Sequence, residues 1–344
     1  MSVKNKILDI IEKKTFISLE EFMDISLHDK EFGYYKNSKP LGTSGDFITS
    51  PEISQLYGEM IGLWMSQLII TNDIKNFNLV ELGPGNGTLI ADVLRVLKST
   101  LKDISFIKIH FIENNIHFIK KLNIDFPNAT IHSDIKTTPD DFSIFIANEF
   151  FDALPVIQIK KDEEKFKKLV IKKDVNGELK KEFIFFKNDK EFEYLESLKL
   201  KNGDIYEISN KTNDIIKIIA KKIKVFGGFI LFSDYGYSEL KLKSTLSSMK
   251  NNKTTSFLSN LGEQDLTAHV NFKRINEIFK NHNIENLRTV KQSEFLKQMG
   301  IELRASKLIK SNPIKEKEIL SGMNRLIDLG EMGSLFKIIY TDYK

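Results

Sequence analysis

The sequence contains no cysteine, which excludes disulfide bonds, thiol nucleophiles and cysteine-ligated zinc and suits a reducing compartment. It also lacks any apolar run close to the roughly 20 residues that a membrane-spanning helix needs. The N-terminal stretch MSVKNKILDIIEKKTF mixes acids with lysines and has no small-residue cleavage site. It predicts an ordinary amphipathic helix and no targeting peptide, so we expect a protein of the bacterial cytoplasm.

Arginine is scarce, and neither sign of charge is in large excess. Only five of the 51 basic residues are arginines, and the net charge is +4 because acids are interleaved with the lysines. Strong nonspecific binding to nucleic acid is therefore not indicated. The six histidines show no spacing typical of a metal site. With 41% hydrophobic residues over 344 positions, the chain is typical of a globular protein with a large core.

Short β-branched or aromatic runs alternate with helical patterns through the centre of the chain, which predicts βαβ units and a parallel sheet. We expect strands at 77–82, 106–112, 129–132, 142–147 and 229–233. A helix is expected at 212–226, and the apolar run 335–340 is expected to form an edge strand. Lysine-rich alternating segments around Asn176-Gly177 predict an inserted β-hairpin or small sheet over 156–202. The predicted fold class is α/β.

The stretch "FNLVELGPGNGTLIADVLRVL", residues 77–97, predicts a strand, a tight glycine turn and a helix. This is how an open α/β sheet builds a nucleotide-type site. A dinucleotide fingerprint would have its third glycine at 88, but that residue is Thr88; the glycines are Gly83, Gly85 and Gly87. With Glu81 ahead of them, the pattern Glu-x-Gly-x-Gly-x-Gly is typical of Rossmann-like methyltransferases that use S-adenosylmethionine.

The following two strands each end in an acid. Glu113 closes "IKIHFIE" and is expected to accept both ribose hydroxyls of a bound nucleoside. Asp134-Ile135 follows the third strand and would suit the adenine amino group and ring face. The alternative for Asp134 is a solvent-facing turn aspartate.

The fourth strand ends in "IANEFFDALP", residues 146–155, which places an amide and two acids at the ligand-binding edge. Carboxylates of Glu149 and Asp152 would hold a guanidinium, which is planar and always charged. Asn148 with Phe151 is also similar to the Asn-Pro-Pro-Phe/Tyr motif of enzymes that methylate amide or adenine nitrogens, although the prolines are missing. The structural alternative is that Asn148 and Asp152 cap a turn while the phenylalanines join the core.

The stretch "GDFITSPEIS", residues 45–54, precedes an amphipathic helical pattern. Capping explains part of it, because Ser50 would cap the helix, Pro51 suits its first turn and Glu52 complements the helix dipole. Capping does not explain Gly45-Asp46-Phe47, which belongs to a long polar loop that begins near Gly33.

The sequence as a whole resembles the MidA-like methyltransferases. Their mitochondrial member supports assembly of respiratory complex I by methylating an arginine of one of its subunits. The resemblance spans nearly the whole chain and is carried by "EFGYY" (31–35), "GDFITSPEISQLYGEMIGLW" (45–64), "ELGPGNGTL" (81–89), "NEFFDALP" (148–155), "SDYGY" (233–237), "DLTAHVNF" (265–272) and "MGSLFK" (332–337).

The resemblance implies a class I methyltransferase sheet with helices on both faces, in a core of residues 76–155 and 203–344. Residues 1–75 would form a helical cap beside the cofactor cleft, and 156–202 the insertion. The residues implied to contact S-adenosylmethionine are Glu81, Gly83, Gly85, Gly87, Glu113, Asp134, Asp46, Thr49, Ser50 and Glu52. Those implied beside the substrate nitrogen are Asn148, Glu149 and Asp152.

The chain departs from the family pattern between 241 and 262. Ser244 and Asn251 or Asn252 stand where the family has an acid and a histidine, so substrate or activity would differ if this loop contacts substrate. His269 in "DLTAHV" is the histidine of interest, although a lone histidine is more often structural.

Three functions follow as hypotheses. The first is methylation of an arginine in a protein, such as a subunit of a complex I type assembly. The second is a non-catalytic assembly factor that keeps the fold, and the third is methylation of adenine in nucleic acid, which lacks a basic, aromatic-rich face for the strand.

Overall fold

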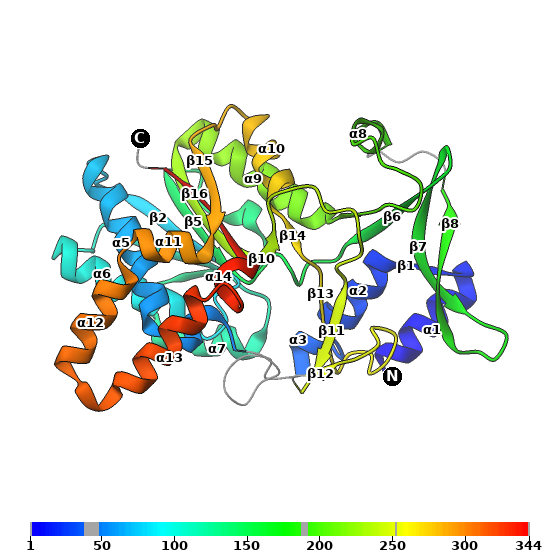
Figure 1. Ribbon diagram of the computed structural model, residues 1–344, viewed down its shortest axis with the longest axis horizontal. Helices are drawn as coiled ribbons and strands as arrows, with labels where there is room; N and C mark the ends of the chain where they lie inside the picture. The colour runs from blue at the N-terminus through cyan, green and yellow to red at the C-terminus, as the bar shows by residue number, and fades with distance from the viewer. Residues whose placement is uncertain (1, 38–47, 187–191, 252, 343–344) are drawn as a thin grey trace.

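The computed structural model describes residues 2–37, 48–186, 192–251 and 253–342. An eight-stranded sheet forms its centre in the order β15-β16-β10-β5-β2-β3-β4, with β14 paired to β10 (Figure 1). Its strands are β2 (Phe77–Leu82), β3 (Ile107–Ile112), β4 (Thr130–His132), β5 (Ser143–Asn148), β10 (Gly228–Tyr237), β14 (Val270–Asn271), β15 (Leu287–Lys291) and β16 (Phe336–Thr341). Strands β4, β3, β2, β5 and β10 are parallel, and the strand order reverses beside β2. Open α/β sheets bind ligands at the carboxyl ends of strands next to such a reversal.

The predicted α/β class and the five central strands are confirmed, with ends that differ by one residue or, for β10, by several. The position of the last strand was predicted wrongly. β16 is not an edge strand but lies antiparallel between β10 and β15. The edge strand on that side is β15, which has no buried side chain and no apolar run, so the sequence pattern did not reveal it.

Helices cover both faces of the sheet because successive strand residues point to opposite sides. Leu79 of β2 packs into the core formed with the first group of helices, whereas Val80 and Leu82 pack into the core formed with the second. The first group is α5 (Gln55–Thr71), α6 (Thr88–Leu101), α7 (Ile116–Asp125), α11 (Gln292–Gln298), α12 (Ile301–Ser311) and α13 (Glu316–Ile327). The second is α9 (Asn210–Phe226) and α10 (Phe272–Lys280). Helix α9 matches the prediction for 212–226.

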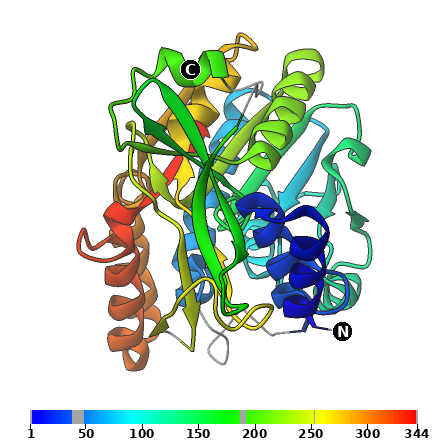
Figure 2. The ribbon, with the colours of Figure 1, turned by 90° about the vertical axis from the view of Figure 1, so that its right-hand side faces the viewer.

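A second, five-stranded sheet contains β1 (Ile17–Ser18), β6 (Ile157–Asp162), β7 (Lys165–Lys173), β8 (Leu179–Phe185) and β9 (Ile205–Ile208). Strands β7 and β8 form a hairpin, and β1 ties the N-terminal helices α1 (Val3–Lys14) and α2 (Leu19–His28) to β7. Figure 2 looks onto this hairpin, with the two helices beside it. The division at 75, 156 and 202 stays a prediction.

The remaining elements are short. They are α3 (Tyr34–Asn37), α4 (Ser50–Ile53), α8 (Phe192–Ser197), α14 (Met332–Leu335), the 3₁₀ turns at Ile135–Thr137 and Pro313–Lys315, and a small sheet of β11 (Ser247–Lys250), β12 (Lys253–Thr254) and β13 (Asp265–Thr267). Among the described residues, no helix is both long and apolar enough to cross a membrane.

The helix predicted to follow a Ser50 cap is in fact two helices, α4 and α5. Thr49 is the N-cap residue of α4, and the side chain of Ser54 caps α5. The prediction that Ser50 is the cap was therefore wrong, because Ser50 is the first residue of α4. Pro51 does lie in the first turn of α4, as expected.

Candidate active site

The turn between β2 and α6 depends on its glycines. Gly83, Gly85 and Gly87 have φ angles of 65°, 53° and 76°, a left-handed region that other residues rarely adopt. A Cβ atom on Gly83 would lie 2.7 Å from Cδ2 of Phe150, and one on Gly87 would lie 2.7 Å from Cε2 of Phe126. A side chain at Gly83 or Gly87 would therefore collide with these phenylalanines, so the turn requires glycine at both positions.

A cavity opens at this turn and brings together residues from three parts of the sequence, 49–52, 81–89 and 148–149. Six of the predicted site residues line it: Thr49, Glu52, Glu81, Gly83, Asn148 and Glu149. Sequence reasoning missed five others: Pro51, Pro84, Asn86, Thr88 and Leu89. Asn86 stands inside the glycine motif itself, so the motif was the available signal for it.

Two acids in the cavity, Glu81 and Glu52, each have one buried acceptor atom without a hydrogen-bond partner. Glu81 is 2% exposed, and its Oε2 has no hydrogen-bond partner. Burial, together with the charge of Glu113, raises the pKa of Glu81 to about 8. Oε1 of Glu52 accepts a hydrogen bond from Nδ2 of Asn86 at 2.7 Å, whereas its Oε2 is buried without a partner. Such atoms suit a ligand that brings hydrogen-bond donors or positive charge.

The acids at the ends of β3 and β4 do not line this cavity. Oε1 of Glu113 accepts hydrogen bonds from the backbone amides of Asn114 and Asn115, each at 2.8 Å. Burial raises the pKa of Glu113, and these amides oppose that rise. Asp134 is exposed and caps the 3₁₀ turn after β4 through the amide of Lys136 at 2.9 Å. The predicted contacts of Glu113 and Asp134 with ribose and adenine remain predictions.

Glu149 follows β5 directly and has a φ of 51°, which is unusual for a residue with a side chain. Its Oε1 accepts hydrogen bonds from the amide of Ser50 at 2.8 Å and from Nδ2 of Asn148 at 3.1 Å. Oδ1 of Asn148 in turn accepts the hydroxyl of the buried Tyr57 at 2.6 Å. The α4 segment and helix α5 therefore both orient the end of β5. Burial is the main cause that raises the pKa of Glu149 to about 7.

The turn after Glu149 is held by Asp234 of β10. Its Oδ2 accepts the backbone amides of Phe150, Phe151 and Asp152 at 3.1, 2.8 and 3.3 Å. Asp234 is fully buried and was not among the predicted site residues. It does lie in "SDYGY", one of the stretches that carry the family resemblance.

The carboxylates at this edge of the sheet repel one another. Burial raises the pKa of Asp152, and the charges of Asp234, Asp265 and Glu149 raise it further. Burial likewise raises the pKa of Asp234, against the amides that it binds. Among the described residues, no lysine or arginine is one of the main causes that shift the pKa of Glu149, Asp152 or Asp234. The main causes are burial, the charges of other carboxylates and hydrogen bonds.

Ser50, Gly85, Gly87 and Asp152 do not line the cavity. The backbone amide of Ser50 donates to Glu149, and the charges of Asp234, Asp265 and Glu149 act on Asp152. Asp46 falls outside the described residues. No group of histidines and acids in the described ranges is arranged to hold a metal ion.

The 241–262 loop packs against the second sheet. The hydroxyl of Ser244 accepts Nε2 of Gln158 at 2.7 Å, and Asn252 lies outside the described residues. His269 has Nδ1 3.0 Å from Nζ of Lys241, and burial lowers the pKa of His269 to about 4. A neutral histidine in this setting fits the structural role.

Comparison with known proteins gives the family. A family model described as "Putative S-adenosyl-L-methionine-dependent methyltransferase" matches residues 60–290. Protein arginine methyltransferase NDUFAF7 homolog, mitochondrial, of Caenorhabditis elegans is 32% identical over 97% of this chain and 85% of that protein. Human protein arginine methyltransferase NDUFAF7, mitochondrial, is 31% identical over 93% of this chain and 78% of its own length.

A solved structure shares the fold. A Burkholderia thailandensis protein bound to S-adenosyl-homocysteine superposes with a TM-score of 0.85 at 20% identity, covering 99% of this chain and 92% of that one.

The residues that line the cavity fit S-adenosylmethionine independently of the comparisons with known proteins. This cofactor carries an ammonium and a sulfonium, and the unpartnered oxygens of Glu81 and Glu52 offer acceptors for positive charge and for N–H donors. The glycine turn gives the close backbone approach that such a ligand needs. The chain belongs to the family of S-adenosylmethionine-dependent methyltransferases that includes the NDUFAF7 proteins, and S-adenosylmethionine is its cofactor.

Proposed function

We propose that the protein methylates an arginine side chain of a protein substrate. The observation that carries the proposal is the cluster of buried acids at the ends of β5 and β10, where the described residues supply no lysine or arginine among the main causes of the pKa shifts. A guanidinium keeps its charge when buried and offers N–H donors in a plane, so it would relieve the repulsion between these acids. The names of the relatives, which are protein arginine methyltransferases, support the same substrate class.

The chain's own residues have distinct tasks in this proposal. Glu81, Glu52 and the Gly83 turn hold the cofactor, which supplies the methyl group when bound. Glu149 and Asp152 hold the guanidinium so that one nitrogen faces the methyl group, and positioning of this kind supplies much of the rate. Glu149 then takes the proton that this nitrogen loses, because a pKa of about 7 suits a general base near neutral pH.

Two finer expectations belong to the proposal. The substrate would be a subunit of a complex I type assembly, and methylation would aid that assembly, as the family resemblance implies. The expected location in a bacterial cytoplasm also stays a prediction.

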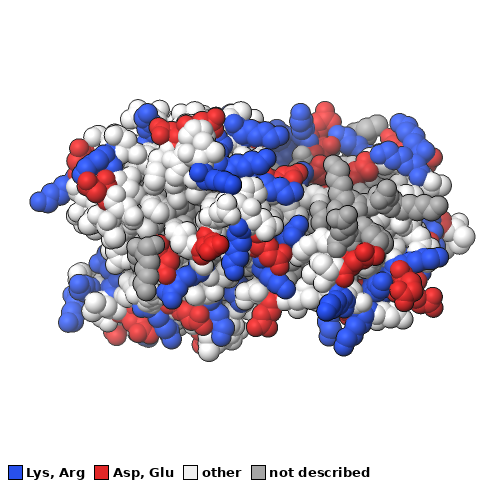
Figure 3. Space-filling view, turned by 90° about the horizontal axis from the view of Figure 1, so that it is seen from above, with Lys and Arg blue, Asp and Glu red and all other residues white. Residues whose placement is uncertain are grey.

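The other two hypotheses have less support. Methylation of adenine would need Asn148 to bind the base, but both polar atoms of its side chain are already bonded to Tyr57 and Glu149. The face seen in Figure 3 also mixes basic and acidic side chains and presents no continuous basic track for a nucleic-acid strand. A non-catalytic assembly factor would have no use for an acid-lined cavity above an intact glycine turn.

The test is transfer of labelled methyl from S-adenosylmethionine into a lysate that lacks this activity, with Gly85→Val as the control. Valine at a φ of 53° would strain the turn and block the ligand. Label that depends on Gly85 and disappears with protease supports the proposal, and hydrolysis should recover it as methylarginine. Label lost to nuclease would favour the adenine hypothesis. No label, from protein shown to bind the cofactor, would favour the assembly factor.

A further inference from the structure

Positive charge collects at the carboxyl end of the central sheet, on the side of β10 away from the cofactor cavity. Three lysines form what we call the basic patch: Lys241, which follows β10, Lys291 at the end of β15 and Lys337 near the start of β16. These three strand ends meet because β16 runs antiparallel to both β10 and β15. None of the three lysines lines the cofactor cavity, so the patch does not serve the cofactor there.

The lysines of the basic patch lie close enough to repel one another. Lys291 and Lys337 are direct partners in the register of β15 and β16, so their side chains leave the same face of the sheet. Burial lowers the pKa of Lys337, and the charges of Lys291 and Lys241 lower it further. Like charges opposite each other destabilise a sheet, so this arrangement costs the folded protein stability.

Little of this charge is neutralised within the described part of the chain. The ammonium of Lys337 donates to a backbone carbonyl, and Nζ of Lys241 lies 3.0 Å from Nδ1 of His269. Neither ammonium forms an ion pair with a described carboxylate. Lys291 has one such partner, Glu294, but at 3.9 Å the contact is long. The patch therefore keeps most of its positive charge.

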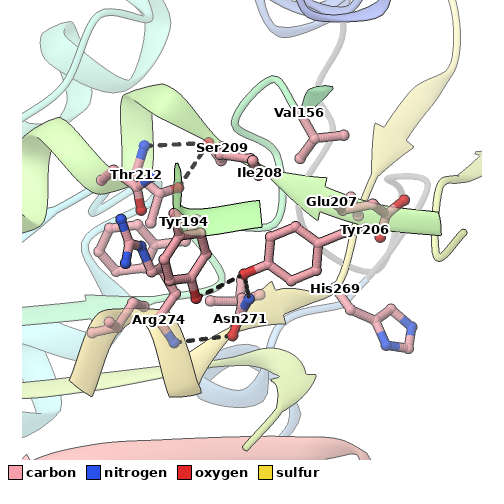
Figure 4. A pocket seen from close by; sticks show the side chains of 15 residues that line it. Val156, Tyr194, Tyr206, Glu207, Ile208, Ser209, Thr212, His269, Asn271 and Arg274 are labelled. Atoms are coloured by element: carbon pink, nitrogen blue, oxygen red, sulfur yellow. Dashed lines mark hydrogen bonds between the residues drawn. The ribbon is translucent and has the colours of Figure 1, made fainter. Parts of the chain in front are cut away.

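His269 is neutral and adds no charge to the patch. Burial, helped by the charges of Lys241 and Lys337, lowers the pKa of His269 to about 4. Its Nδ1 therefore accepts a hydrogen bond from Lys241 near neutral pH. Figure 4 shows the ring turned away from a cavity lined by two tyrosines, and it packs against the ring of Tyr235 with centroids 4.0 Å apart.

The basic patch adjoins the acid cluster of the proposed substrate site. Lys337 is the register partner of Asp234, which places their Cα atoms about 5 Å apart. Lys291 lies one strand further, at roughly another 5 Å. The amide of Ala268 also donates to the carbonyl oxygen of Asp152 at 3.0 Å, which ties the segment before β14 to the catalytic turn. Two groups of opposite charge thus lie side by side.

This arrangement suits a substrate segment that contains both signs of charge. An extended peptide advances about 3.3 Å per residue, so a residue two to four positions from a bound arginine lies roughly 7–13 Å from it. That distance reaches the patch from the acid cluster. A carboxylate there would relieve the repulsion between Lys337 and Lys291, whereas a second basic residue would add to it.

We propose that the basic patch binds an acidic side chain of the substrate protein, two to four residues from the target arginine. Lys241 and Lys337 would thereby select which arginine is methylated. The inference rests on the proposed function, because it takes arginine as the residue that enters the acid cluster.

The test compares peptides that differ only in the charge of one side chain. Each peptide has a central arginine among alanines and glycines, with one glutamate two, three or four residues away on either side, or glutamine at the same place. The measured quantity is kcat/KM for transfer of labelled methyl from S-adenosylmethionine. We expect at least one glutamate peptide to exceed its glutamine counterpart at least fivefold, and Lys337→Gln to reduce this ratio to twofold or less.

The ratio between the two peptides cancels any general effect of a variant on catalysis. Lys98→Gln is the matched control, because Lys98 is exposed in the last turn of α6, whereas the first turn of that helix lines the cofactor cavity. It should keep the wild-type ratio. No glutamate preference at any position, or the same ratio in Lys337→Gln and wild type, would overturn the proposal. Lys241→Gln decides the question if Lys337→Gln does not fold.

The stability of Lys337→Gln separates a binding role from a structural one. Glutamine removes the repulsion with Lys291, so the unfolding midpoint should stay unchanged or rise. A lower midpoint together with the wild-type peptide ratio would show that Lys337 is structural and would overturn the assignment.

Binding of the same peptides in the presence of S-adenosylhomocysteine, measured by fluorescence anisotropy, separates this inference from the proposed function. Methylation without a glutamate preference would support the proposed function and overturn the role of the basic patch. Tighter binding of a glutamate peptide that is lost in Lys337→Gln, without methylation of any arginine, would support the patch and overturn the proposed reaction. Neither methylation nor charge-dependent binding would overturn both.

Discussion

Glu149 adopts a left-handed backbone conformation that costs a residue with a side chain roughly 1–2 kcal/mol. The cost is offset by the bonds around it. Its amide donates to the carbonyl of Ser233 at 2.9 Å, and Asp234 binds the next three amides. Strain of this kind persists where the surrounding structure fixes a functional group, which is consistent with the proposed role of Glu149.

Glu149→Gln should lower kcat by roughly 10²–10⁴-fold, the range typical of a lost general base. The affinity for S-adenosylmethionine should change little, because the glutamine keeps the size of the side chain and its bond to Ser50. Steady-state kinetics and calorimetric titration of the cofactor measure the two effects. An equal loss in both would remove the proposed role.

The pH profile should report the same group. Burial raises the pKa of Glu149 to about 7, and only its ionised form accepts a proton, so kcat/KM should rise with pH and level off above about 7. In Glu149→Gln this inflection should be absent. A wild-type profile that is flat from pH 6 to 8 would contradict the assignment.

Asp234→Asn should lower kcat about tenfold or more with a smaller change in KM. An asparagine that presents its Nδ2 to the three amides repels them, and one that presents Oδ1 binds them less strongly than a carboxylate. Hydrogen exchange of the Phe150–Asp152 amides should speed up in this variant. Ser233→Ala is the control, since the Ser233 hydroxyl binds none of the three amides, all of which donate to Asp234; the same exchange rates in both variants would argue against a positioning role.

Helix α5 shows what a local pattern predicts and what it misses. The spacing of Leu56, Met60 and Trp64 predicted a helix correctly, but not that α5 would be buried on nearly every side. Glu59 is 2% exposed because Arg304 binds both of its oxygens, at 2.8 and 2.9 Å. A partner 245 residues away leaves no trace in the local pattern.

Helices α5 and α6 approach closely at two glycines. A Cβ on Gly62 would lie 2.8 Å from Cβ of Val96, and one on Gly58 would lie 2.5 Å from Cβ of Asp92. Gly62→Ala should therefore lower the free energy of unfolding by about 1–3 kcal/mol, the usual cost of overpacking, despite the better helix propensity of alanine. Chemical denaturation measures this change. Gly330→Ala, which lies near only the flexible end of Asp328, should be close to neutral; equal effects would contradict tight packing.

The parts of the site that could be predicted are those whose residues lie together in one short segment of the sequence. Strand, turn and helix around Gly83 could be derived from residues 77–97, and the acids that follow β5 from one short segment. The roles of Asp234 and Tyr57 could not be derived from the sequence. Each residue acts through contacts that form only when β10 or α5 packs beside β5. Asn86 was inside the motif but was missed because its partner, Glu52, lies on another element.

Stability should fall as the pH rises from 6.5 to 8 in the absence of ligands. Burial raises the folded-state pKa of Glu81 to about 8 and of Glu149 to about 7, well above the ordinary value of 4.5. The folded protein then holds protons that the unfolded chain has lost, and each such proton costs about 1.4 kcal/mol per pH unit.

His110 and His269, whose pKa values burial lowers to about 4, affect stability only below their ordinary value of 6.5. Glu81 and Glu149 alone account for a loss of roughly 2 kcal/mol between pH 6.5 and 8. Asp234, whose pKa burial raises to about 8, adds to this loss, and chemical denaturation at each pH measures the total. Glu81→Gln should reduce the slope. A flat profile in wild type would mean that these acids are ionised in the folded protein.

Strand β16 has a consequence for how the protein is made. It fills the position between β10 and β15, so β10 keeps one bare edge from the time it is synthesised until residues 336–341 leave the ribosome. Unpaired strand edges recruit other strands, and partly made chains are crowded together on polysomes. The nascent chain is therefore more exposed to edge-to-edge aggregation during this interval than after β16 has paired, and a chaperone that shields β10 during translation would protect it.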